Sequence, residues 1–266
     1  MKWFLAINEG SPYFRQYGDM IRVAVLTAAR HTHLEPHLLY DGEPCELTQW
    51  LEGRGVVIIN RRWRLLGEFN RVARECGRTE LMGYAGGIFL RMEVPRVCAE
   101  RGWADEEVLY TDCDIMFMGD PQPLFPDLRG AFFGVGPESD PEDPAHMNSG
   151  VMLMRLPALA ALDGSFEEFV RIAMADCARY TDQFAYDVYF RHGWRALPPE
   201  LNWKPYWGEN PAARIVHFHG PKPFIRAALE AGMAGTQTQR DMARGAYAHY
   251  SEVWESVLRT GGEISN

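Results

Sequence analysis

The 266-residue sequence lacks the features that mark several large classes of protein. Its five cysteines are odd in number and have no C-x-x-C spacing, which argues against a disulfide framework or a zinc ribbon and fits a reducing compartment. Runs of about 18 apolar residues are absent, so we expect no transmembrane helix. Lys/Arg blocks are also absent, and the formal net charge is −9. This balance argues against an electrostatic nucleic-acid binder.

The N-terminal segment has no signal-peptide core, because Asn8 and Glu9 interrupt the first apolar residues. There is no internal repeat, low-complexity tract or linker. A chain of this length can bury about 70–75% of its unfolded surface, so one large domain is expected. We therefore expect a cytoplasmic protein, and we leave open a peripheral association with the inner membrane.

The first half of the chain alternates between apolar runs and stretches with helical spacing. Strands are predicted at 2–8, 34–41, 55–60 and 106–114, and helices at 13–31, 62–76 and 80–100. This alternation predicts a mostly parallel sheet with covering helices. The uniformly apolar run 55–60 is typical of a strand that is covered on both faces.

After residue 114 the alternation changes. Apolar runs at 131–137 and 148–156 are followed by helices at 157–179 and 182–192, a late strand in 213–223 and a helical stretch over 226–259. Tyr247, Tyr250 and Trp254 share one face of that last stretch. We predict an α/β domain over 1–225 and a helical C-terminal extension over 226–266.

Two aspartates, Asp112 and Asp114, end the predicted strand 106–114. Two carboxylates so close repel each other unless a cation lies between them. Alternate residues of a strand share a face, so both can point at one ion while Cys113 points away. Ligands of open parallel sheets bind beyond the carboxyl ends of the strands. The two aspartates and the end of the predicted strand 2–8 would therefore lie at the same, ligand-binding edge. The alternative is a polar strand end with both groups solvated.

The late segment "VHFHGPKP" offers cationic and imidazole groups. His217 and His219 would share a strand face, and either could bind a metal or be structural. Lys222, between prolines, is suited to phosphate. Two carboxylates, one imidazole and phosphate oxygens suit Mn²⁺, with Mg²⁺ as a second possibility.

Three further segments have both a structural and a functional interpretation. Asn148 and Ser149 precede a strand, either as a turn or as contacts to a hydroxyl-rich ligand, with Gly150 keeping the backbone clear. Asp182 caps a helix or, with Gln183, contacts a ligand. Arg91 on a predicted helix would ordinarily be solvated.

Five segments together resemble glycosyltransferase family 8, which includes the glycogenins and bacterial lipooligosaccharide galactosyltransferases. They are "LAIN", "FLRMEVP", "LYTDCDIMF", "NSGVML" with "TDQ", and "HFHGPKP", in this order over residues 5–223. The resemblance, to a divergent bacterial-type member, implies a GT-A (Rossmann-like) fold, a UDP-sugar donor, a Mn²⁺ ion and retention of anomeric configuration.

The resemblance also implies roles for individual residues. Asp112, Asp114 and His217 resemble the metal ligands, and Asp112 also faces the donor. Asp182 and Gln183 resemble the catalytic pair beneath the reacting carbon. The remaining implied donor contacts are Ile7, Asn8, Tyr13 (as a stacking partner), Arg91, Asn148, Ser149, His219 and Lys222. The sequence departs from the family in having only Pro221 between Gly220 and Lys222, and Phe224 in place of a tryptophan. The choice between His217 and His219 as the ligand stays open.

The expected activity is therefore transfer of a hexosyl group from a UDP-sugar to a hydroxyl acceptor, which the resemblance suggests is a surface glycan. The alternatives are a sugar-nucleotide-binding protein without turnover, a metal-dependent phosphatase and a nucleotidyltransferase. A phosphatase of the haloacid dehalogenase type would carry its D-x-D after the first strand, whereas three predicted strands precede Asp112. The identity of the sugar, acceptor and linkage, the route of retention and the oligomeric state are left open.

Overall fold

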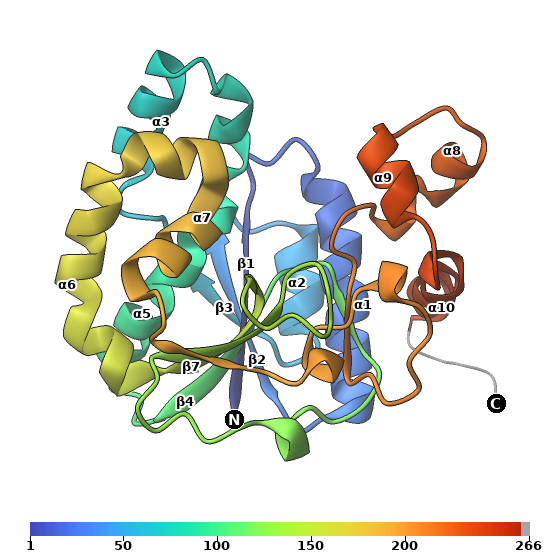
Figure 1. Cartoon of the computed structure of the whole chain (residues 1–266), viewed down its shortest axis with the longest axis horizontal. Coiled ribbons are helices and arrows are strands. Elements are labelled where there is room, and N and C mark those ends of the chain that lie inside the picture. Colours follow the sequence, from blue (N-terminus) through green and yellow to red (C-terminus); the bar gives the residue numbers. More distant parts are fainter. Residues whose placement is uncertain (262–266) are drawn as a thin grey trace.

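A seven-stranded sheet lies between two layers of helices in the computed structural model, which describes residues 1–261 apart from the side chains of 178–180 (Figure 1). The strand order is β3-β2-β1-β4-β7-β6-β8. Strand β7 runs antiparallel to β4 and β6, and the other neighbouring strands are parallel. The strands are β1 Lys2–Asn8, β2 Glu35–Asp41, β3 Val57–Asn60, β4 Glu107–Thr111, β6 Phe133–Pro137, β7 Met147–Arg155 and β8 Trp194–Ala196. Strands β5 (Ile115–Phe117) and β9 (Ile215–His217) form a separate antiparallel pair.

The helices follow the predicted order, with several interruptions. The α-helices are α1 Phe14–His31, α2 Glu46–Glu52, α3 Leu66–Glu75, α4 Ala85–Ile88, α5 Val94–Glu100, α6 Leu156–Ile172, α7 Met174–Phe190, α8 Arg226–Glu230, α9 Gln237–Met242 and α10 Tyr247–Thr260. The short 3-10 helices are η1 Thr79–Gly83, η2 Phe89–Glu93, η3 Gln122–Leu124, η4 Pro199–Leu201, η5 Pro205–Trp207 and η6 Pro223–Ile225. The single helix predicted at 80–100 is wrong, because η1, α4, η2 and α5 replace it.

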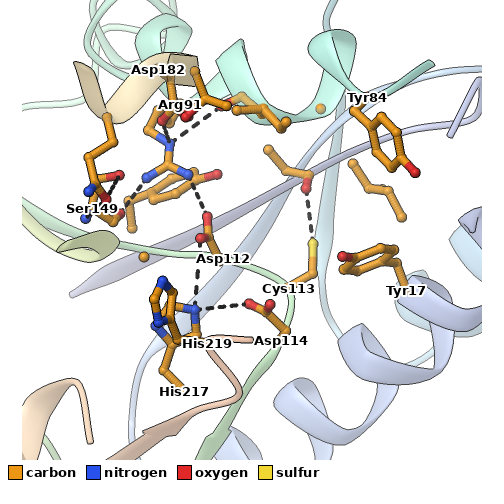
Figure 2. Close-up of a pocket in the computed structure, with 18 of the residues that line it drawn as sticks. Tyr17, Tyr84, Arg91, Asp112, Cys113, Asp114, Ser149, Asp182, His217 and His219 are labelled. Atoms are coloured by element: carbon orange, nitrogen blue, oxygen red, sulfur yellow. Dashed lines mark hydrogen bonds and ion pairs between the residues drawn. The ribbon is translucent and has the colours of Figure 1, made fainter. Parts of the chain in front are cut away.

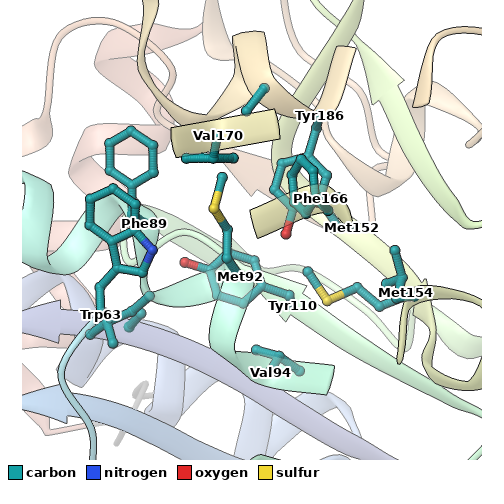
Figure 3. Close-up of a cluster of buried hydrophobic side chains, with 14 of the residues drawn as sticks. Trp63, Phe89, Met92, Val94, Tyr110, Met152, Met154, Phe166, Val170 and Tyr186 are labelled. Carbon is teal, nitrogen blue, oxygen red and sulfur yellow. The ribbon is translucent and has the colours of Figure 1, made fainter. Parts of the chain in front are cut away.

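Alternating side chains of the strands build two cores, one on each face of the sheet. Phe4 and Tyr110 lie in the core beneath α3, α5, α6 and α7, whereas Leu5 and Leu109 lie in the core beneath α1 and α2. Figure 3 shows the first core, where Trp63 and Phe89 stack with ring centroids 4.2 Å apart. Burial on both faces follows from the apolar character of the strands, as expected for a mostly parallel sheet.

Two strand predictions require correction. Strand β3 lies at the edge of the sheet and Val57 is 41% exposed, so it is not covered on both faces. Strand β4 ends at Thr111, so Asp112 and Asp114 lie in the link between β4 and β5 rather than on a strand. In this link, backbone hydrogen bonds to other segments replace the regular hydrogen bonds between neighbouring strands.

Helix α10 packs on α1. Tyr247, Tyr250 and Trp254 of α10 are buried in a third cluster with Met20 and Val23 of α1, so their predicted shared face is an internal contact. The boundary at 225 between domain and extension stays a prediction, and residues 262–266 of the extension lie outside the described residues. Among the helices of residues 1–261, none combines the length and apolarity that crossing a bilayer requires.

A buried ion network joins η2 to the elements around it. Glu93 is 0% exposed, and its carboxylate lies 2.6 Å from Arg61 Nη2 and 2.8 Å from Arg64 Nε. Arg64 in turn reaches Asp163 and Glu167 of α6. The network therefore anchors the short helix η2 to the segment that follows β3 and to α6.

We predict that Glu93→Ala lowers the free energy of unfolding by about 3 kcal/mol, because it leaves two arginines without a buried partner. Urea denaturation measures this loss. Glu75→Ala removes an exposed i,i+4 pair with Arg71 and serves as the control, with an expected loss of about 0.5 kcal/mol. Equal losses in the two variants would contradict the anchoring role of Glu93.

Candidate active site

A cavity of about 450 Å³ opens at the carboxyl edge of the sheet, a size typical of small-molecule sites. The ends of β1 and β4, the start of β7, η2 and residues 217–222 contribute to its lining. Every residue that the sequence predicted for the site lines the cavity except Tyr13. Figure 2 shows Tyr17 and Tyr84 on one side of it and Arg91 with Asp182 on the other.

Backbone hydrogen bonds hold the two aspartates toward a common point. The amide of Asp112 donates to the carbonyl of Gly150 (2.8 Å), and the carbonyl of Asp114 accepts from the amide of Phe218 (2.9 Å). Pairing of β5 with β9 places Ile115 opposite His217. Cys113 points the other way, with Sγ donating to the carbonyl of Ala6 (3.0 Å).

Asp112, Asp114 and His217 offer three ligand atoms that all lie within 4.8 Å of one another. His217 Nε2 is 3.3 Å from Asp114 Oδ1 and 4.0 Å from Asp112 Oδ2. The other histidine, His219, bonds to Tyr206 Oη (3.0 Å) and Glu138 Oε1 (3.2 Å). The geometry therefore places His217, rather than His219, beside the aspartates.

The donor set fits a divalent cation. Asp114 Oδ1 is buried without a hydrogen-bond partner in the described part of the chain, which is costly for a carboxylate oxygen. Two carboxylates and an imidazole nitrogen are ligands that Mn²⁺ accepts readily. Mg²⁺, the second possibility, would use the two carboxylates of the same set.

Lys222 is the second cationic group at Asp114. Its Nζ lies 2.5 Å from Asp114 Oδ2 and donates to the carbonyl of Phe218 (2.7 Å), so the shortened loop does reach the site. Burial alone would raise the pKa of Asp114, but Lys222 and His217 outweigh it and hold that pKa well below its usual range. Burial lowers the pKa of His217, opposed by Asp114.

Arg91 connects two carboxylates from distant segments. It is 3% exposed, and it lies 2.5 Å from Asp112 Oδ1 through Nη2 and 2.7 Å from Asp182 Oδ2 through Nε. Its Nη1 donates to the carbonyl of Ser149, and its guanidinium lies 4.7 Å from the ring centroid of Tyr110. Burial opposes its charge, yet the two aspartates raise the pKa of Arg91 further. The interpretation of Arg91 as a solvated surface residue is therefore wrong.

Asp182 and Gln183 follow a break in α7. Thr181 has φ 68° and ψ −166°, a conformation unusual for a β-branched residue, and the helix restarts after it. The sequence correctly indicated a helix start here. Gln183 Oε1 accepts from the amide of Ser149 at 3.0 Å, so the two predicted pairs meet.

Asn148 and Ser149 reach the same edge because β7 is reversed, so that its first residues lie where β1 and β4 end. The expected reason for Gly150 needs correction. A Cβ atom there would lie 2.2 Å from His217 Cε1. The glycine makes room for the imidazole of His217 rather than for a hydroxyl-rich ligand.

The far end of the cavity is lined by Ile7, Asn8, Tyr17 and Tyr84. Asn8 Nδ2 donates to the carbonyl of Gly83 (3.0 Å). Tyr13 is 45% exposed outside the lining, with its ring 6.2 Å from that of Tyr84. The sequence analysis missed Tyr17 and Tyr84. The helical spacing of residues 13–31 indicates only an apolar face that includes Tyr17, whereas its position in the first turn of α1, just after the loop that follows β1, is a signal for the site.

This sheet order, with a reversed β7 and the Asp-x-Asp link after β4, defines a GT-A fold, and three solved glycosyltransferases share it. The first is the galactosyltransferase LgtC in complex with donor and acceptor sugar analogs, with a TM-score of 0.65 and 16% identity over 100% of this chain and 98% of LgtC. The second is GlyE of Streptococcus pneumoniae TIGR4, with a TM-score of 0.64 and 16% identity over 97% of this chain and 62% of GlyE. The third is mouse xyloside xylosyltransferase 1, with a TM-score of 0.55 and 15% identity over 82% of this chain and 97% of that protein.

The predicted GT-A fold is thus confirmed, and the likeness to family 8 is supported at the level of the fold. The chain spans about 62% of the length of the GlyE structure. No protein-family model matches the sequence, and no curated protein matches it either.

We predict that Gly150→Ala weakens Mn²⁺ binding at least 10-fold, because the added Cβ displaces the His217 ring. Isothermal titration calorimetry measures the affinity. Gly164→Ala, where a Cβ meets nothing within 4 Å, is the control and should leave Mn²⁺ affinity unchanged. It should also stabilise α6 by about 0.5–1 kcal/mol. Unchanged affinity in Gly150→Ala would refute the placement of His217.

Proposed function

We propose that this protein is a Mn²⁺-dependent retaining glycosyltransferase that transfers a hexosyl group from a UDP-sugar to a hydroxyl acceptor. The observation that carries the proposal is the convergence of Asp112, Asp114, His217 and Lys222 at the carboxyl edge of a GT-A sheet. LgtC, which shares the fold, was solved with donor and acceptor sugar analogs. A cavity of about 450 Å³ is large enough for most of such a donor.

The cavity divides into an aromatic end and a charged end. Tyr17 and Tyr84 beside Asn8 offer apolar faces and an amide, which suit a nucleobase. The metal group and Lys222 lie next to them and suit a diphosphate. Asn148, Ser149 and Gln183 offer uncharged polar groups to the sugar beyond it. This order of chemistries along the cavity supports a nucleotide-sugar donor.

Asp112, Asp114 and His217 would hold the Mn²⁺ ion, whose chemistry when bound is Lewis-acid stabilisation of a leaving diphosphate. Lys222 supports the same charge from the protein side. Its ammonium is held beside the metal group by Asp114 and by the Phe218 carbonyl, and it would turn from Asp114 to the diphosphate once a cation is bound. Arg91 keeps Asp112 and Asp182 in place by direct ion pairs.

The carboxylates favour retention over inversion. An inverting enzyme needs a carboxylate or histidine base that is free to deprotonate the acceptor. The three carboxylates that line the cavity within the described residues are Asp112 and Asp114, which belong to the metal group, and Asp182, which is paired with Arg91. The two histidines of the lining are His217, which belongs to the metal group, and His219, whose two ring nitrogens face Tyr206 Oη and Glu138 Oε1. Gln183 is uncharged and cannot act as that base; its carbonyl oxygen, which accepts from the amide of Ser149, would stabilise positive charge at the anomeric carbon through its remaining lone pair.

We expect a panel of nucleotide sugars with Mn²⁺ to include a UDP-hexose that is hydrolysed slowly, and transferred when an acceptor is present. Chelation should abolish both reactions, and Asp114→Asn should reduce them at least 100-fold by removing a metal ligand. NMR of the first-formed product should show an α-linkage from an α-linked donor. A β-linked product would overturn retention, and donor binding without turnover would indicate a binding protein.

We further predict opposite effects of Lys222→Met on two binding steps. Removing the ammonium should tighten Mn²⁺ binding in the absence of nucleotide, because Asp114 loses a competing cation. It should weaken UDP binding and lower turnover roughly 100-fold, because the diphosphate loses a positive partner. Calorimetry with Mn²⁺ alone, followed by UDP, separates the two. Weaker binding of Mn²⁺ alone would show that Lys222 organises the site rather than competing in it.

A further inference from the structure

A continuous chain of side-chain hydrogen bonds leads away from the metal group. His217 Nδ1 lies 2.9 Å from Asn202 Oδ1, and Asn202 Nδ2 lies 2.9 Å from Asn148 Oδ1. Asn148 Nδ2 lies 2.8 Å from Glu138 Oε2. Asn202 and His217 are buried along this chain, so solvent does not decide which way each group points.

Asn148 determines which group donates and which accepts in each hydrogen bond of this series. An ionised Glu138 can accept hydrogen bonds but cannot donate them. Hydrogen bonds from His219, Asn148 and Gln183 outweigh its burial and hold its pKa at about 2. The amide of Gly150 can only donate, and it lies 3.2 Å from Asn148 Oδ1. Asn148 must therefore turn its NH₂ toward Glu138 and its oxygen toward Gly150 and Asn202.

The direction then passes from Asn148 to His217. Because Asn148 Oδ1 is an acceptor, Asn202 must present its NH₂ to it and its own oxygen to the imidazole. That oxygen can only accept, so the proton of the neutral imidazole lies on Nδ1. Nε2 is then a lone pair that faces Asp114 Oδ1 at 3.3 Å. A lone pair and a carboxylate oxygen at this separation are stabilised by a cation between them, a metal ion or the second proton of an imidazolium, and Nδ1 carries a proton in both cases.

We propose that Asn202, with its orientation set by Asn148 and Glu138, is a positioning residue that holds His217 in the tautomer able to bind a metal through Nε2. Partners of this kind fix ring orientation and ligand basicity at metal sites. The inference rests on the proposed function only in taking the cation of the site to be Mn²⁺.

Glu138 also directs a second arm of the same network. Its Oε2 accepts from Gln183 Nε2 at 3.2 Å, which leaves Gln183 Oε1 to the amide and hydroxyl of Ser149. One carboxylate thereby sets the orientation of the amide that faces the sugar and of the amides behind the metal ligand. Sequence analysis gave no sign of this, because Glu138 and Asn202 match no segment of the family resemblance.

The segment that carries Asn202 also fixes the backbone of Glu138. The carbonyls of Pro137, Glu138 and Ser139 accept, in turn, from Lys204 Nζ, Tyr206 Oη and Trp207 Nε1. Lys204 is 0% exposed, so this contact is internal. A Cβ on Gly136 would lie 2.7 Å from Asn202 Cβ, so glycine makes room for the positioning residue.

The tautomer can be measured directly in wild-type protein freed of metal by chelation. At a pH where the imidazole is neutral, long-range ¹H–¹⁵N correlation spectra should show His217 protonated on Nδ1 and unprotonated on Nε2. Asn202→Ala should lose this single tautomer and bind Mn²⁺ about 10–100-fold more weakly by calorimetry. Glu138→Ala should show a smaller effect of the same sign, because the Gly150 amide still orients Asn148.

Two variants serve as controls. Glu138→Gln can still offer an oxygen to Asn148, so the tautomer should persist and Mn²⁺ affinity should stay within about 3-fold, as expected if orientation rather than charge matters. Asn210→Ala removes a turn residue outside the network and should change neither readout. A neutral wild-type His217 protonated on Nε2 alone, or Asn202→Ala with unchanged tautomer and affinity, would overturn the proposal. Failure to turn over any donor, with the tautomer as expected, would count against the proposed function alone.

Discussion

The arrangement of the site depends on the repulsion between three carboxylates gathered at one edge of the sheet. Asp112, Asp114 and Asp182 would be costly to hold together without matched positive charge. Asp112 and Asp182 share the single positive charge of Arg91 through direct ion pairs, and Lys222 pairs with Asp114. These partners come from η2 and the loop after β9. The carboxylates therefore gain their ion partners only when these distant segments have folded against the strand ends.

The sheet topology explains how such distant segments meet. Parallel strands bring only their carboxyl ends to the ligand edge, which accounts for Asn8 after β1 and Asp112 after β4. The reversed β7 adds an amino end to the same edge, with Asn148 and Ser149. The pairing of β5 with β9 then places His217 directly across from the residue that follows Asp114. One reversed strand and one short ladder thus assemble a site that a wholly parallel sheet could not.

Local sequence patterns predicted the strands and the two aspartates at the end of one of them, because those features follow from periodicity and from position at strand ends. Most other residues of the lining came from the resemblance to glycosyltransferase family 8. Local patterns could not predict that Arg91 is buried, since its ion partners lie in segments far along the chain. They also could not predict residues whose role is a contact with a distant side chain. Gly150 leaves room for the ring of His217, and Asn202 is hydrogen-bonded to that ring. Such roles depend on contacts between elements, about which a single sequence carries no periodic signal.

The positive charges of the site differ in how firmly they are held. Arg91 is fixed by Asp112, Asp182 and the Ser149 carbonyl, and its buried guanidinium cannot leave one partner without exposing charge to an apolar surrounding. Lys222 holds Asp114 through a flexible side chain on a short loop, so it can turn toward an incoming anion without moving the backbone. A divalent cation at Asp114 would release Lys222 for that purpose. Fixed compensation by Arg91 therefore preserves the shape of the site, whereas exchangeable compensation by Lys222 leaves it able to respond to a charged ligand.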